Sequence, residues 1–355
     1  MPSRGGVQWR VPRIGFCSVL AAVVVLLGYA HGWFSFGSNP WAVSKVIGIF
    51  ILLGYALTAA LIVSVAGETG RDALLKSLLL AFLGIALLEY GRYLASGFGF
   101  PRLGRVEGFA QDPNAFAFQI LIVLSILLSG LIRHRFAIPA LMACLAMIWL
   151  SGSRSGVIAA CVMLPFALYF RPRLTGMILS AAVLAAVALT LPVFIEAALS
   201  GTAISNSPST LNVMLEPRNF SFDERWRSLE LGFDMFASHP IFGAGLGAFV
   251  GQVQRADGSP LIIHSSYLWL LAEFGLVGFA IFVLPLLNIV RHTWRTARCS
   301  VTSRIAILVL IGWSTMTLAH DLLYQRLFWF ALGAVLALPA AKVLGNRECP
   351  PLKVV

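Results

Sequence analysis

The chain has 355 residues, of which 59% are hydrophobic and only 12% are charged, and this balance excludes a soluble globular enzyme. Its formal net charge of +11 is typical of nucleic-acid-binding proteins, but also of membrane proteins whose basic residues lie on the cytoplasmic side. Because the apolar residues form runs of about 20, the length that crosses a bilayer as a helix, we interpret the charge as a topology signal. We therefore expect membrane lipids, and no nucleic acid, as partners.

We expect an all-α fold, a polytopic transmembrane helical bundle of about ten spans, in which residues 1–355 form a single integral membrane domain. The predicted spans are 14–33, 43–65, 74–95, 113–132, 136–151, 155–170, 174–195, 264–290, 305–320 and 324–344. Eight of the nine connections are short, whereas residues 196–263 form one large loop between the seventh and eighth spans. A loop of that length inside a compact domain is usually functional.

The positions of Lys and Arg predict the orientation, because basic residues in short loops stay in the cytoplasm. With the N-terminus inside, 16 of the 26 basic residues fall in cytoplasmic segments, where only Glu68, Asp72 and Glu348 oppose them. We therefore expect a multi-pass protein of the bacterial inner membrane with both ends in the cytoplasm. The 196–263 loop then lies in the periplasm.

Two polar motifs stand at the predicted outer ends of spans. Gln111-Asp-Pro-Asn114, preceded by Arg105, begins the fourth span, and Pro113 suits the first position of a helix, so we favour a structural role for this motif. Ser151-Gly-Ser-Arg154-Ser-Gly156 joins the fifth and sixth spans tightly, with Arg154 as its only charge. Arg154 is either a functional residue or an interfacial arginine whose side chain reaches lipid phosphate.

The second half of the large loop contains a predicted helix. Ser221-Phe-Asp-Glu224 is a capping box, and His239-Pro240 ends the run. Apolar residues recur between them at helical spacing: Trp226, Leu229, Phe233 and Phe236. At 100° per residue, Arg225 lies at the edge of this apolar stripe and Arg227 on the opposite, charged face. We expect the stripe to pack on the transmembrane body, which directs Arg225 to the outer leaflet and Arg227 to water.

The loop ends in a glycine motif and a histidine. Gly243-Ala-Gly245-Leu-Gly247 either exposes backbone N–H groups to an anion or permits close packing. His264 stands where the chain re-enters the membrane, at a helix N-terminus whose dipole disfavours imidazolium, so it stays neutral and can accept a proton from a hydroxyl. A structural interfacial histidine would explain the residue equally well. The remaining histidines lack metal-ligand spacing and the first outer loop, 34–42, has no acidic residue, so we expect no metal.

His264-Ser265, followed after nine residues by Gly275-Leu-Val-Gly278, resembles the signature of the O-antigen ligase and polysaccharide polymerase family. Similar elements occur in the same order: Asp112-Pro-Asn114, Ser153-Arg-Ser-Gly156, Arg225 and Pro240-Ile-Phe-Gly243-Ala-Gly245. The resemblance covers residues 100–290. The chain departs from the family in its smaller number of predicted spans, since about twelve are typical, and in Ser265, where asparagine is frequent.

The resemblance implies a metal-independent glycosyltransferase without cofactors. It would move a glycan from undecaprenyl pyrophosphate to an acceptor sugar hydroxyl at the periplasmic face. His264 matches the base that deprotonates the acceptor, and Arg154 and Arg225 match a clamp on the pyrophosphate, a group that suits the bidentate guanidinium. The further substrate contacts that we expect are Arg105, Asn114, Gly243, Gly245 and Ser265.

The resemblance leaves the acceptor open. A polymerase would extend an exopolysaccharide or O-antigen chain, whereas a ligase of lipopolysaccharide biosynthesis would use lipid A–core, and the short chain favours a polymerase. The alternative from another class is a secondary transporter or flippase for lipid-linked glycans. Against it, the sequence has no pair of broken helices in matching halves.

Overall fold

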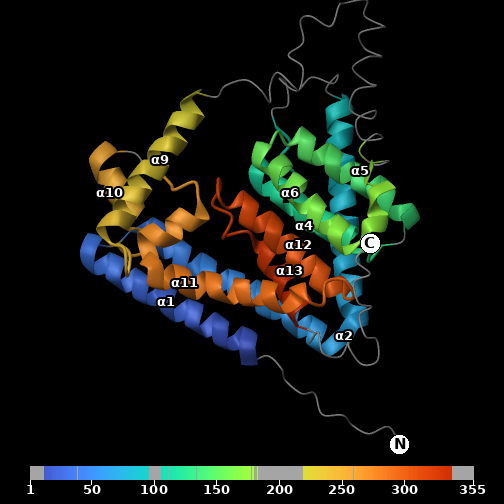
Figure 1. The fold of residues 1–355 in the computed structure, drawn as a ribbon. Helices are drawn as coiled ribbons and strands as arrows, with labels where there is room; N and C mark the ends of the chain where they lie inside the picture. The colour runs from blue at the N-terminus through green and yellow to red at the C-terminus, as the bar shows by residue number, and fades with distance from the viewer. Residues whose placement is uncertain are drawn as a thin grey trace, which may run out of the picture.

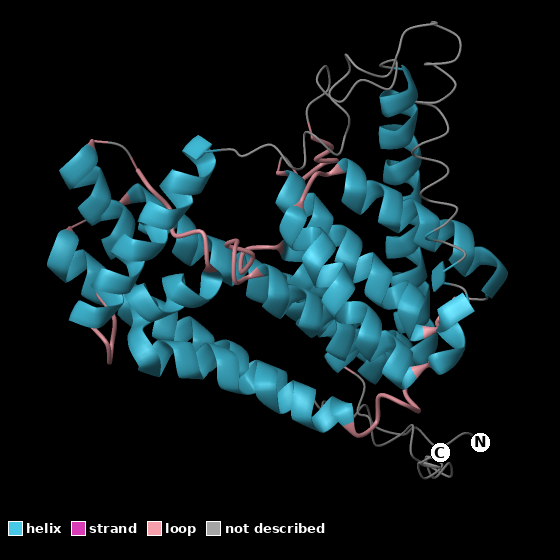
Figure 2. Ribbon diagram, turned by 45° about the horizontal axis from the view of Figure 1, so that its top comes forward, coloured by secondary structure: helices cyan, strands magenta, loops and turns pink. Residues whose placement is uncertain are grey.

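The computed structural model describes residues 12–37, 39–95, 105–110, 112–132, 134–176, 178–179, 182, 219–258 and 260–337. This part of the chain is helical and contains no strand (Figures 1 and 2). Its α-helices are α1 (Pro12–Phe36), α2 (Pro40–Ala95), α4 (Pro113–Ser129), α5 (His134–Leu150), α6 (Arg154–Phe170), α9 (Asn219–Ser238), α10 (Ala248–Asp257), α11 (Ser266–Trp294), α12 (Val301–Met316) and α13 (Arg326–Leu336). The all-α prediction is confirmed over these residues.

The predicted spans 43–65 and 74–95 belong to one long element, α2. Its 56 residues would extend about 84 Å if straight, far beyond a bilayer core of about 30 Å. The helix is interrupted at Gly67, whose φ of 66° and ψ of −155° are not helical. Two legs result, and they run in different directions (Figure 1). The kink thus stands where we expected a short cytoplasmic loop.

By length and composition, three of the described helices can cross a membrane: Val19–Phe36, Pro40–Ala95 and Ser266–Arg291. Five shorter apolar helices, of 10 to 17 residues, accompany them, and four of these, α4, α5, α6 and α12, overlap the spans predicted at 113–132, 136–151, 155–170 and 305–320. Most of the span predicted at 174–195 lies outside the described residues, as does the end of the last one. The number of about ten spans stays a prediction.

Helix α4 forms the centre of the bundle. All of its residues from Asn114 to Ser129 are buried except Gln119, and it packs against α5, α6 and α12. Helix α2 packs along α13, where a Cβ atom at Gly333 would come within 2.1 Å of the Ala56 carbonyl oxygen. Small residues permit such close contact between membrane helices, whose association depends on packing.

One end of the bundle gathers several of the arginines that we expected in the cytoplasm. The Arg304 guanidinium donates to the carbonyl oxygens of Ser129, Ala297 and Arg298 at 2.8 to 3.0 Å, which joins the ends of α4 and α11 to the start of α12. Arg71, just after the α2 kink, donates to the Thr302 hydroxyl at 2.5 Å. Residues predicted to share one side of the membrane therefore lie together, in agreement with the predicted alternation of spans.

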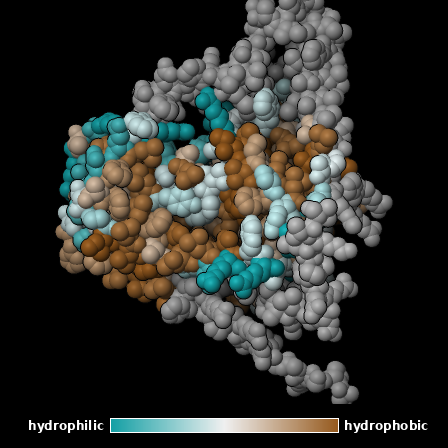
Figure 3. Space-filling view, in the orientation of Figure 1, coloured by the Kyte–Doolittle hydropathy of each residue, from teal (hydrophilic) through white to brown (hydrophobic). Residues whose placement is uncertain are grey.

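The described part of the 196–263 loop contains two helices, α9 and α10, which lie at one side of the bundle (Figure 1). Helix α9 ends at Ser238, as predicted, but begins at Asn219, so Ser221 lies inside the helix and is not its N-cap. Helix α10 was missed. Hydrophilic residues gather over α9 and α10, whereas the surface along α1 and α11 is hydrophobic (Figure 3).

Candidate functional site

The start of α4 is held by a carboxylate cap and a buried amide. Asp112 accepts hydrogen bonds from the backbone N–H groups of Asn114 and Ala115, and Pro113 occupies the first helical turn, so the predicted structural role of this motif is confirmed. Asn114 is buried, and its side-chain oxygen accepts from Arg105 Nη2 at 3.1 Å and from the Ser153 hydroxyl at 2.9 Å. The amide thus connects two loops that are distant in sequence.

The turn between α5 and α6 is the second part of this network. Arg105 Nε donates to the Ser151 carbonyl oxygen at 2.7 Å, and Ser153 caps α6 by accepting from the Gly156 N–H. Arg154 is the first residue of α6 and its side chain is exposed. Arg105 and Arg154 therefore flank the same turn, one half-buried and one exposed.

His264 directly precedes the cap of α11. Ser265 is that cap: its hydroxyl accepts from the Leu268 N–H and donates to the Thr317 carbonyl oxygen, while the Ser266 N–H donates to the same oxygen at 3.1 Å. We expected Ser265 to contact substrate, but its hydroxyl makes these two internal bonds. They fasten the entry of α11 to the end of α12 and so fix the backbone on which His264 is carried.

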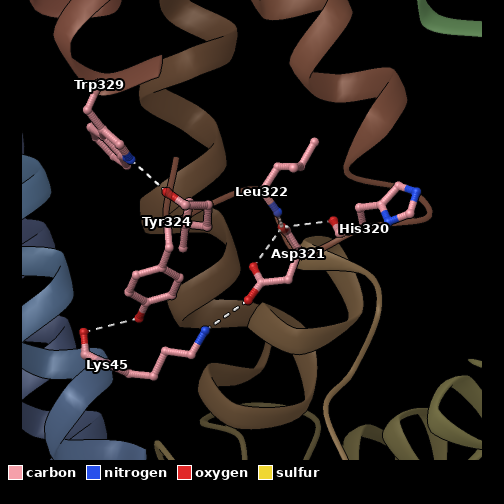
Figure 4. A network of polar contacts seen from close by, with 8 residues as sticks. Lys45, His320, Asp321, Leu322, Tyr324 and Trp329 are labelled. Atoms are coloured by element: carbon pink, nitrogen blue, oxygen red, sulfur yellow. Dashed lines mark hydrogen bonds and ion pairs between the residues drawn. The ribbon is translucent and has the colours of Figure 1, made fainter. Parts of the chain in front are cut away.

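The connection between α12 and α13 reaches the same place. The Ser266 hydroxyl contacts the His320 carbonyl oxygen at 3.3 Å and Asp321 Oδ1 at 3.1 Å, and it accepts from the Leu322 N–H. Asp321 Oδ2 pairs with Lys45 Nζ of α2 at 2.9 Å, with both side chains about 15% exposed. Figure 4 shows the Lys45 and Asp321 side chains pointing toward each other, whereas the His320 ring points away from them.

Charged residues from several segments shift the pKa values of the two histidines. Burial lowers the pKa of His264 below its usual value, and the positive charge of Arg225 lowers it further, whereas Glu224, Asp321 and Asp112 oppose the shift. Burial likewise lowers the pKa of His320 to about 4, with contributions from Arg225, His264 and Arg105 and opposition from Asp112. Both imidazoles are consequently neutral at pH 7, beside arginines from α9 and from the segment before α4.

Helix α9 presents a different face to the protein than we predicted. Its buried residues are Ser228, Gly232 and Met235, and Gly232 faces Ile263 and Leu268. Trp226 and Phe233, which we expected to pack on the body, are 55% and 60% exposed. The prediction of the packed stripe was therefore wrong by about a third of a turn, at 100° per residue.

The two arginines of α9 nevertheless differ as predicted. Arg225 is half-buried and acts on both histidines. Arg227 is exposed and forms a surface ion pair with Asp257 of α10 at 2.5 Å. Arg225 thus belongs to the candidate site and Arg227 to the solvated surface.

The glycine motif serves close packing. Gly243 and Gly245 have positive φ, and a Cβ atom on either would lie 2.4 Å from backbone atoms of Glu273 and Gly32 respectively. Their N–H groups donate to the carbonyl oxygens of His239 and Glu273. Since these donors are used inside the fold, we assign the motif to packing between α1 and α11, one of the two roles that the sequence left open.

Residues 139–283 match the family model described as O-antigen ligase. The chain is thus similar to the O-antigen ligase and polymerase family over 145 of its 355 residues. These matched residues, the O-antigen ligase segment, end within α11 and include Arg154, Arg225 and His264. Arg105, Asn114 and His320 lie outside the segment. No curated protein matches the chain. At the family level, the match indicates glycan transfer of the ligase or polymerase type by a membrane protein.

His320, Asp321 and Lys45 were missed as members of the site. A histidine and an aspartate at the end of an apolar run are costly at membrane depth, and that signal alone marks them as candidates. Lys45 has the same signal near the start of the second predicted span. Their partners, however, are up to 276 residues away in sequence, and no local pattern reveals them.

Proposed function

We propose that this protein transfers a glycan from undecaprenyl pyrophosphate to an acceptor sugar hydroxyl at the periplasmic face of the inner membrane. The observation that carries the proposal is the effect of Arg225 on His264: burial and the positive charge of this arginine lower the pKa of His264, while Arg105 acts on the neighbouring His320. A neutral base beside fixed positive charge suits a reaction that removes a proton from a hydroxyl and releases an anionic phosphate.

In this mechanism His264 accepts the proton of the acceptor hydroxyl as the oxygen attacks the anomeric carbon of the donor. The bond from that carbon to the pyrophosphate oxygen breaks, and the leaving group carries the negative charge. Arg225 and Arg154 bind the pyrophosphate and stabilise the charge that develops on it. Arg105 contributes to the same field, although its bonds to Ser151 and Asn114 also hold the α5–α6 turn in place.

We propose a polymerase first, with a ligase as its alternative. The product distinguishes the two: a deletion strain that loses chain length lacks a polymerase, and one that keeps long chains but no longer attaches them to lipid A–core lacks a ligase. Unchanged glycans, combined with lipid-linked intermediates that accumulate on the cytoplasmic side, would instead identify a flippase.

The proposal is tested by His264→Ala in a complemented deletion strain. Loss of glycan transfer is expected, with the protein still inserted and abundant, because the side chain lies outside the bonds that fasten α11. The matched control is His239→Ala, since His239 is exposed in the turn after α9. Near-normal polymer in the His264→Ala strain would refute the mechanism.

A further inference from the structure

His320 is a buried histidine whose ring forms no hydrogen bond with the described residues. Its side chain is only 8% exposed, and neither ring nitrogen makes a hydrogen bond among the residues that the structure describes. The bond that anchors this residue runs through its backbone, because its carbonyl oxygen contacts the Ser266 hydroxyl. A buried polar group normally finds a partner. Since no described residue bonds to them, the nitrogens of the His320 ring can contact a group that binds to the protein.

The surroundings of the ring point to the reaction site. His320 follows α12 in the connection that is bonded to Ser265 and Ser266, the two residues after His264. Its ring points away from the Lys45–Asp321 ion pair (Figure 4). The charges that act on it are Arg225, Asp112 and Arg105, together with His264 itself. His320 thus faces the segments that carry the proposed base and the proposed pyrophosphate clamp.

We propose that His320 is a substrate-contacting residue that hydrogen-bonds a sugar hydroxyl beside His264. The inference rests on the proposed glycan transfer and adds a residue to it. A neutral imidazole carries one N–H donor and one nitrogen acceptor, the complement of a hydroxyl, which both donates and accepts. The nearby arginines, which only donate, suit the anionic phosphates instead. In this proposal the arginines bind the pyrophosphate of the substrate, and His320 binds its sugar.

The test measures initial rates of the purified full chain at pH 5 to 9. The probe is the undecaprenyl-pyrophosphate-linked oligosaccharide extracted from the deletion strain, with free oligosaccharide released from it by mild acid as added acceptor. The variants are His320→Ala, His320→Asn and His320→Gln, and the amides each restore a donor and an acceptor near one ring nitrogen. His239→Ala is the matched control.

The expected result is a fall in kcat/KM of about tenfold for His320→Ala, the effect of one lost hydrogen bond, with recovery by Asn or Gln. The acidic limb of the pH profile should not move, because a group with a pKa of about 4 is neutral throughout the range in which His264 titrates. A higher KM for free oligosaccharide would place the contact on the acceptor, and a higher KM for the lipid-linked probe on the donor.

Three outcomes would overturn the inference: a rate of His320→Ala within twofold of the wild type, a loss that neither amide recovers, or a displaced acidic limb, which would make His320 a base. Failure of the proposed function gives a different pattern. His264→Ala would then keep its activity, whatever the His320 variants do.

Discussion

Arg225 and Arg227 are two residues apart in α9, but only the first is half-buried beside the histidines. We predict that Arg225→Ala lowers transfer by on the order of 10²–10³-fold, the usual effect of removing one group that stabilises developing charge. Arg225→Lys should restore little, because an ammonium lacks the bidentate fork. Glycan transfer at matched expression measures the effect.

Arg227→Ala is the control for this prediction, since it removes the same charge from the same helix. The surface pair that it breaks, with Asp257, is 56% exposed on the arginine side, so the change should be nearly silent. Equal activity of the two alanine variants, or a larger defect at Arg227, would place the pyrophosphate on the other face of α9.

The lowered pKa of His264 predicts how activity depends on pH. A base must be neutral to work, so transfer should persist below the usual histidine pKa of 6.5 and fall as pH drops through the lower, folded-state value. Glu224 raises this pKa, and Glu224→Gln should therefore move the acidic limb to still lower pH. The rate profile of the purified variant measures the shift. Glu230→Gln, on the same helix, should leave the limb where it is.

Some site residues could be predicted from sequence because their signals are local. The Asp112 cap, Pro113 in the first turn of α4 and the position of His264 before α11 each depend on neighbours within a few residues. His320 depends on contacts with distant segments, and its backbone anchor, Ser266, is 54 residues away. Physical chemistry marks such a residue as costly but does not say which segments surround it.

The α12–α13 connection is attached to α2 by the Lys45–Asp321 ion pair and by a hydrogen bond from the Tyr324 hydroxyl to the Lys45 carbonyl oxygen. Lys45 and Asp321 are each about 15% exposed, and the Lys45 ammonium also lies 3.8 Å from the Tyr324 ring centroid. We predict that Lys45→Met destabilises the protein by about 3 kcal/mol, because it leaves a buried carboxylate without its partner. Thermal unfolding in detergent is the measurement.

The double variant Lys45→Met with Asp321→Asn separates charge from packing. It should recover much of the lost stability, since no unpaired charge is left in the interior. If the double variant were less stable than Lys45→Met alone, the Asp321 carboxylate would make an interaction with another residue that stabilises the protein more than its pairing with Lys45. Arg227→Ala is again a suitable reference, because an exposed pair contributes about 0–1 kcal/mol.

Helix α9 shows which elements sequence patterns place well and which they do not. Its end at Ser238 was predicted, because Pro240 prevents the helix from continuing. Its orientation was wrong, because close contact of a small residue, and not the apolar stripe, decides which face of α9 is buried. A Cβ atom at Gly232 would lie 3.1 Å from the side chains of Ile263 and Leu268, whereas Trp226 and Phe233 stay exposed.

Across the whole molecule we predict a reaction independent of divalent metal ions. Arg225, Arg154 and Arg105 supply the positive charge that a metal would otherwise bring to a pyrophosphate. Transfer by the purified protein should therefore survive chelation with EDTA. A requirement for added magnesium or manganese would mean that the arginines do not suffice and would exclude the proposed mechanism.

Helix α1 shares no motif with the family, but hydrogen bonding and close packing attach it to the glycine motif at 243–247. The Leu246 N–H donates to the Gly28 carbonyl oxygen at 2.8 Å, and Gly32 and Gly245 meet backbone to backbone. One loop of the O-antigen ligase segment thus packs on a helix that lies more than a hundred residues before the segment begins. A generic membrane anchor could not replace α1, because it would bring a Cβ atom where only glycine fits. Helix α1 is therefore part of the structure of the matched segment, although it lies outside the matched residues.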